Sequence, residues 1–126
     1  MNRHVIERYI AETYSISGDH PFERYPDVTV YRHPYGNKWF AAIMSVSKRK
    51  LGLDSSEVIY IMNVKTSVDV IASFINEDGF FPAYHMNKSH WISITLDGSV
   101  PFDQIKWFLS VSYNLTKKKS RKNSIQ

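Results

Sequence analysis

The residues best suited to contact a ligand gather in one short stretch, residues 81–91. It holds aromatic rings, two histidines, an amide and an ammonium group within eleven residues. Aromatic rings can stack on bases, while amide and ammonium groups donate hydrogen bonds to phosphate or carbonyl oxygens. The candidate binding residues from this stretch are Tyr84, His85, Asn87, Lys88, His90 and Trp91.

The stretch leads into residues 90–96, whose apolar/polar alternation predicts a half-buried strand. His90 is in phase with Ile92, so we expect it to point toward the core. Trp91 is in phase with Ser93, so we expect it on the opposite, wetter face. Core packing does not require an indole there, which favours a binding surface. The alternative is that Trp91 lies under a neighbouring loop and that Asn87 only closes a turn.

Further basic candidates lie on other predicted segments of the same sheet. Lys48, Arg49 and Lys50 form a triplet in a predicted polar loop, residues 47–56, where they could approach phosphate groups. Lys38 and Lys65 flank two predicted strands. The alternative interpretation is that these lysines are ordinary solvated loop residues.

The spacing of the polar residues does not favour catalysis or metal binding. None of the five histidines forms the i,i+4 helical pair typical of a zinc site. Ser89 directly precedes His90, but consecutive side chains of a strand point to opposite faces, so they do not make a dyad. No phosphate-cradling glycine loop is present in the sequence. We therefore expect a non-enzymatic protein with no catalytic residues, no metal and no cofactor.

The basic charge is concentrated at the C-terminal end. The net charge of +4 arises from 16 basic and 12 acidic residues. Five of the basic residues lie in residues 117–126, so the rest of the chain has 16 − 5 = 11 basic against 12 acidic residues, or −1. We expect one domain over residues 1–116 and a disordered basic tail over 117–126, whose one apolar residue is Ile125.

Composition bounds the location and the class of protein. With 43% hydrophobic residues, the chain is typical of a globular domain. The sequence has no cysteine, which excludes disulfides and thiolate catalysis and agrees with a reducing cytoplasm. No signal peptide or membrane-spanning run is visible, so we expect a cytoplasmic protein that does not contact the membrane.

The periodicity of the chain predicts an α+β fold, with an antiparallel β-sheet and helices packed on one face. Residues 3–14 and 101–115 each carry one apolar stripe, which predicts two helices that share a surface. A shorter helix is expected over residues 67–76, capped by Thr66 or Ser67 and ended by Gly79. The remaining predicted strands are residues 28–33, 38–46 and 57–65, of which 38–46 is apolar on both faces.

The sequence also resembles a known family. Residues 82–88, PAYHMNK, followed by His90-Trp91 and by Leu96-Asp97-Gly98, are similar to the signature of the MmcQ/YjbR family of small bacterial proteins. Three short motifs agree with the family in order: Lys38-Trp39-Phe40-Ala41, Asn63-Val64-Lys65 and Ser112-Tyr113-x-Leu115. The resemblance covers residues 1–116. It implies an α+β fold related to that of CyaY/frataxin and a DNA-binding role, and it implies no catalytic residues.

The iron chemistry of CyaY-like proteins is not expected here. Proteins of that type are known for a dense acidic ridge on the first helix and the following strand. Residues 28–46 of this chain contain no acid, and the acids of the first predicted helix are balanced by arginines. The resemblance therefore extends to the fold without the iron site.

We interpret the sequence as that of a binding protein that contacts nucleic acid, with DNA as the expected partner, through the 81–91 loop and the sheet face. The alternative is a protein- or small-molecule-interaction module that uses the Trp91 face and no nucleic acid. A continuous positive patch from Lys48 to Lys88 would favour nucleic acid, a flat apolar patch a protein partner, and a deep pocket a small ligand.

Overall fold

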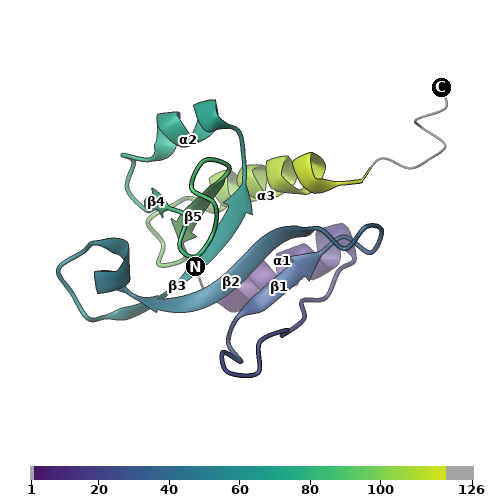
Figure 1. The fold of residues 1–126 in the computed structure, drawn as a ribbon, viewed down its shortest axis with the longest axis horizontal. Coiled ribbons are helices and arrows are strands. Elements are labelled where there is room, and N and C mark those ends of the chain that lie inside the picture. The colour runs from purple at the N-terminus through teal and green to yellow at the C-terminus, as the bar shows by residue number, and fades with distance from the viewer. Residues whose placement is uncertain (1, 119–126) are drawn as a thin grey trace.

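A five-stranded antiparallel sheet, in the order β1-β2-β3-β5-β4, forms the framework of the protein (Figure 1). The computed structural model describes residues 2–118. The strands are β1 (Thr29–Arg32), β2 (Trp39–Ser47), β3 (Val58–Lys65), β4 (Phe80–Pro82) and β5 (Trp91–Thr95). The α+β fold with an antiparallel sheet, predicted from the periodicity, is confirmed.

The first three strands form an antiparallel meander. β2 has buried side chains on both faces, as its doubly apolar pattern predicts, and it is an interior strand. β3, rather than β2, occupies the middle of the sheet. β3 therefore lies between β2 and β5. The turn that follows β2 and the segment that precedes β5 contribute to the candidate site described below.

The helices α1 (Arg3–Tyr14) and α3 (Phe102–Thr116) pack together on one face of the sheet. Tyr14 stacks on Tyr113 with ring centroids 4.5 Å apart, and Tyr9 meets Phe102 edge-on at 5.5 Å. The helix α2 (Val68–Phe74) joins the same core through Phe74. This arrangement confirms the prediction that helices cover one face, since each helix has an apolar stripe that only a common core can bury.

Local capping fixes where the helices begin. Asn2 caps α1 by accepting a 3.1 Å hydrogen bond from the backbone N–H of Val5. Of the two caps proposed for α2, Ser67 is the one used, because its hydroxyl accepts from the Val70 N–H. Gly79 does not end α2, which stops at Phe74. Its φ of +88° instead serves the turn before β4.

The sheet face opposite the helices, which we call the open face, is not bare. It carries a second apolar cluster, formed by Val30, Ala42, Met44, Val46 and Ile61. Among the side chains that pack on this cluster from outside the strands, two also belong to the candidate site described below. They are Leu51, from the short 3-10 helix η1 (Lys48–Leu51), and Tyr84, from the segment between β4 and β5. The face that the sequence predicts to be the wetter one is therefore partly covered by Leu51 and Tyr84.

β4 is an element that the sequence pattern does not predict. Two of its three residues lie in the stretch 81–91, which was expected to be a loop, and it pairs with β5 at the edge of the sheet. Pro82 lacks a backbone N–H and is tolerated there because the outer side of an edge strand needs no donor. At the other edge, Asp19 forms an isolated bridge with Val30 of β1, exchanging two backbone hydrogen bonds of 2.9 Å.

The C-terminal end of the described chain follows α3 directly. Lys117 and Lys118 are exposed. Residues 119–126, which make up most of the predicted basic tail, lie outside the described residues, so the prediction of disorder stays a prediction. Within residues 2–118, no helix combines the length and the apolar character that a membrane span requires.

Candidate binding site

The segment between β4 and β5, residues 83–90, is the signature loop, and hydrogen bonds fix it to the open face. The backbone N–H of Tyr84 donates to the Ser93 hydroxyl at 2.9 Å, and its carbonyl accepts from the Asn63 amide at 2.9 Å. The Ser93 hydroxyl in turn donates to the side-chain oxygen of Asn63. Ser93 and Asn63 are fully buried. Ser93 is thus on the predicted face, but the loop covers it, so that face is not wet at this position.

Within the loop, Asn87 closes the turn. Its side-chain oxygen accepts from the Ser89 N–H at 2.8 Å, and its carbonyl accepts from the Trp91 N–H at 3.0 Å. This is the alternative interpretation given for Asn87, and the side-chain oxygen is therefore occupied. His85 is exposed, adopts a φ of +60°, and lies with its ring 3.9 Å from the Tyr84 ring. A positive φ is uncommon outside glycine, and histidine is one of the residues that adopt it more often than most.

The expectation that His90 points into the core is wrong. β5 begins at Trp91, so His90 lies before the strand and its side chain is exposed. The His90 carbonyl accepts a 2.9 Å hydrogen bond from the Thr66 N–H, which fixes its backbone to the segment between β3 and α2. The expectation fails because His90 belongs to the turn before β5, where the alternation of side chains along a strand does not apply.

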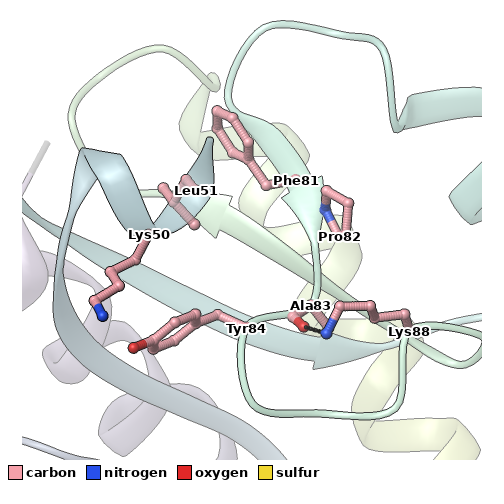
Figure 2. Close-up of a pocket in the computed structure, with 7 residues that line it drawn as sticks. All are labelled: Lys50, Leu51, Phe81, Pro82, Ala83, Tyr84 and Lys88. Atoms are coloured by element: carbon pink, nitrogen blue, oxygen red, sulfur yellow. Dashed lines mark hydrogen bonds between the residues drawn. The ribbon is translucent and has the colours of Figure 1, made fainter. Parts of the chain in front are cut away.

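A pocket of about 150 Å³ lies between η1 and the signature loop (Figure 2). Lys50 and Lys88 lie on opposite sides of it, and the Lys88 ammonium group donates to the Ala83 carbonyl at 2.9 Å. The structure therefore brings together Lys50, Tyr84 and Lys88 from the predicted set. The residues that line the pocket are Lys50, Leu51, Phe81, Pro82, Ala83, Tyr84 and Lys88.

The pocket is apolar inside and cationic at its sides. Among the described residues that line it, none is acidic. Within residues 2–118, neither Lys50 nor Lys88 forms an ion pair with a carboxylate. This arrangement suits a ligand that combines an apolar or aromatic group with negative charge.

The other two members of the basic triplet do not contribute equally. Lys48 forms a 2.6 Å ion pair with Glu57 across the hairpin between β2 and β3. The hydrogen bond to Glu57 raises the pKa of Lys48, so the lysine stays charged while its charge is compensated locally. Arg49 is exposed beside it and does not line the pocket. The positive patch from Lys48 to Lys88 that would favour nucleic acid is therefore not continuous, because the carboxylate of Glu57 compensates the charge of Lys48.

The remaining predicted residues gather at the other end of the sheet. Lys65 is the last residue of β3 and pairs with Trp91, the first residue of β5, so both side chains lie on the open face. Both are half-buried. The exposed Lys38 directly precedes β2. Because β2 runs antiparallel to β3, the start of β2 lies at the same end of the sheet as Lys65, the last residue of β3. We call Lys38, Lys65 and Trp91 the strand-end group.

Two further groups of residues were missed from the sequence. Leu51 forms one wall of the pocket, and its only signal is an apolar residue directly after three basic ones. Trp39 is half-buried on the open face, with Phe22 edge-on at 6.1 Å. The guanidinium of Arg32 lies 5.7 Å from the Trp39 ring, and Asp19 holds Arg32 at 3.0 Å. Consecutive side chains of a strand point to opposite faces, so the burial of Phe40 against the helices places Trp39 on the open face.

No group of three histidine, aspartate or glutamate side chains converges among residues 2–118. The described titratable groups around the pocket are lysines and a tyrosine, which suit contact with an anion more than proton transfer between paired acid and base groups.

Comparison with known proteins identifies relatives of the whole domain. A family model described as YjbR matches residues 11–115. The chain is 38% identical over 117 residues to the Bacillus subtilis protein YyaQ, a match that covers 93% of this chain and 99% of YyaQ. A shorter match to YjbR of Escherichia coli K12 is 41% identical over 49 residues and covers 36% of this chain and 42% of that protein. Both relatives are named as uncharacterised proteins, so neither name carries an activity.

Solved structures agree with the fold. A crystal structure of a Pseudomonas syringae protein has a TM-score of 0.91 and 33% identity, and the match covers 93% of this chain and 100% of that one. A solution structure from the same organism has a TM-score of 0.86 and 32% identity, with coverage of 96% and 97%. A Deinococcus radiodurans protein, with a TM-score of 0.62 and 23% identity over 82% of this chain and 70% of that one, shows the fold alone.

Proposed function

This chain belongs to the YjbR family, and we propose that it is a non-enzymatic nucleic-acid-binding protein, with DNA as the expected ligand. The resemblance indicated by the signature motif is confirmed at the level of the family. In this proposal the pocket between η1 and the signature loop is the main contact, and the strand-end group is a second one. The cytoplasmic location favoured by the absence of cysteine belongs to the same proposal.

The observation that carries the proposal is the convergence of Lys50 and Lys88 on one pocket from segments far apart in the sequence. Two ammonium groups beside an apolar cleft attract an anion, and phosphate is the anion that recurs along a nucleic acid strand. The signature loop is held to the sheet by the buried Asn63 and Ser93, so Lys88 and Tyr84 are preorganised for contact.

The strand-end group supports the proposal with a second type of contact. Trp91 presents part of its indole on the open face, beside Lys65 on the neighbouring strand. An aromatic ring next to a lysine is the combination with which sheet surfaces bind bases and phosphates together. Because residues 1–116 carry 11 basic and 12 acidic residues, the affinity should be modest and strongly dependent on salt.

The test is a titration of fluorescently labelled single- and double-stranded oligonucleotides at two salt concentrations, with the full chain. Lys50→Ala and Lys88→Ala should each weaken binding and lower the salt slope by about one phosphate contact. Lys106→Ala is the matched control, because Lys106 lies on α3 and pairs with Asp103 there. A chain shortened to residues 1–118 should retain the effect of both lysines.

The apolar lining of the pocket favours one alternative, a small-molecule-interaction module. Leu51, Phe81 and Pro82 offer surface that a phosphate alone would not use. Absence of oligonucleotide binding at low salt would reject the nucleic-acid proposal and favour this alternative. Binding that disappears with residues 119–126 but ignores Lys50 and Lys88 would assign the affinity to the basic C-terminal residues instead.

A further inference from the structure

The pocket has more apolar lining than phosphate binding needs. Its floor and walls come from Leu51 of η1, Phe81 and Pro82 of β4, and the ring of Tyr84, while the charged atoms lie at its two sides (Figure 2). A site for phosphate alone is typically built from backbone N–H groups and cationic side chains without such a lining. The part of the ligand that enters the pocket is therefore flat or apolar, and the charge lies outside it.

The size of the pocket limits what enters it. Its volume of about 150 Å³ is below the range of about 300–1,000 Å³ that is usual for whole small-molecule ligands. A cavity of about this volume in another protein holds a single benzene-sized ring. One six-membered ring is thus a better match than a fused two-ring system.

The positions of the two lysines match a base that is part of a strand. Lys50 and Lys88 approach from opposite sides of the pocket, so a nucleotide whose base points inward would place its two flanking phosphates toward the two ammonium groups (Figure 2). Among the described residues around the pocket, no carboxylate opposes those phosphates. Charge complementarity and ring size therefore point to the same kind of ligand.

We propose that this pocket takes one unpaired pyrimidine base of a single strand, so that the protein prefers single-stranded to double-stranded nucleic acid. The inference rests on the proposed function and specifies its ligand. A base within a duplex is stacked and paired, and it reaches a pocket only after extrusion from the helix, which costs free energy. A single strand presents its bases without that cost.

The experiment compares short labelled oligothymidine, oligoadenosine and duplex ligands with the full chain and with two variants. Leu51→Trp fills the pocket and leaves the charge unchanged. Leu53→Trp is the matched control, since Leu53 is 40% exposed on the same hairpin and does not line the pocket. We expect oligothymidine to bind most tightly, Leu51→Trp to weaken that binding about tenfold, and Leu53→Trp to leave it unchanged.

A second measurement does not depend on the folding of Leu51→Trp. Thymidine 5′-monophosphate is added to the unmodified protein, and NMR shifts of Phe81, Tyr84 and Leu51 are followed, with adenosine 5′-monophosphate as the comparison. Shifts confined to these residues and larger for thymidine are the expected result. Equal shifts for both nucleotides would overturn the assignment to a pyrimidine.

The outcomes separate this inference from the proposed function. Equal affinity for single strands and duplex, lowered by Lys50→Ala and Lys88→Ala but not by Leu51→Trp, would overturn the inference and leave the proposed function intact. No binding of any oligonucleotide at low salt would overturn both.

Discussion

The hydroxyl of Ser93 donates a hydrogen bond to the side-chain oxygen of Asn63, directly beneath the signature loop. The two residues are paired across β3 and β5, and both are fully buried. The same two side chains also bind the N–H and the carbonyl of Tyr84. A loop with several exposed polar residues is therefore fixed from below by a polar cluster in which each side chain has a partner.

Removing either member of this cluster should destabilise the protein. Asn63→Ala and Ser93→Ala each leave buried polar groups without a partner, at a cost of about 1–3 kcal/mol. The double variant should lose less than the sum, because the hydrogen bond between Ser93 and Asn63 is lost in either single variant and is counted twice in that sum. Urea unfolding measures all three free energies. Ser89→Ala, in the exposed part of the loop, is the control, and additive losses would show that Asn63 and Ser93 act independently.

Phe40 should matter more for stability than Trp91. Phe40 is fully buried and lies against Tyr113 with ring centroids 5.1 Å apart, whereas Trp91 is half-buried on the open face. Phe40→Ala should cost about 3–5 kcal/mol, and Trp91→Ala less. Thermal and chemical unfolding of the two variants give the comparison. A larger loss for Trp91→Ala would mean that the open face contributes more to the core than its exposure indicates.

The stability of the protein should decrease in mild acid because of His33. This side chain is 3% exposed, with Nε2 2.8 Å from the Thr116 hydroxyl. Burial lowers the pKa of His33 below its ordinary value; a backbone hydrogen bond at Tyr113 opposes this shift, and Lys117 adds to it. The unfolded chain therefore takes up the proton first, and stability is lost as the pH falls from about 6.5 toward the folded pKa.

The measurement for His33 is the free energy of urea unfolding across that pH range. His33→Gln keeps a polar partner for Thr116 but does not titrate, so it should show a smaller loss of stability on acidification. If the two proteins lost stability in parallel, other groups would account for the pH dependence.

Glu57 should weaken nucleic-acid binding, because its carboxylate pairs with Lys48. Its carboxylate holds the Lys48 ammonium group at 2.6 Å, and Lys48 lies on the same hairpin as Lys50. Glu57→Gln should release Lys48 for a phosphate, tighten oligonucleotide binding and raise the salt slope by about one contact. Asp103→Asn, which breaks the comparable pair with Lys106 on α3, is the control and should leave binding unchanged. Unchanged binding by Glu57→Gln would place Lys48 outside the contact surface.

Most of the fold follows from patterns that are local in the sequence. The apolar stripes of α1 and α3 predict their common core, and the alternation after Trp91 places Ile92 and Ile94 inside it. β4 was missed because three residues ending in proline carry too little pattern to be distinguished from a loop. Edge pairing with β5 creates this strand, and that pairing is a property of the assembled sheet.

The site is less predictable than the fold, because it depends on contacts between distant segments. The stretch 81–91 was identified by its chemistry, and Tyr84 and Lys88 do line the pocket. The position of Leu51 against Phe81 depends on how the hairpin after β2 folds back over the sheet, which no periodicity encodes. His90 shows the limit of phase arguments, since one residue of turn reverses the expected direction.

Pro82 has a consequence for how copies of this chain can meet. Exposed strand margins are the usual route by which sheets join and grow into aggregates. On the β4 margin, Pro82 interrupts the row of donors that an incoming strand would need, and β4 is only three residues long. On the β1 margin, Asp19 already occupies both backbone groups of Val30. Both edges of the sheet thus carry features that oppose pairing with a further strand, which disfavours edge-to-edge polymerisation.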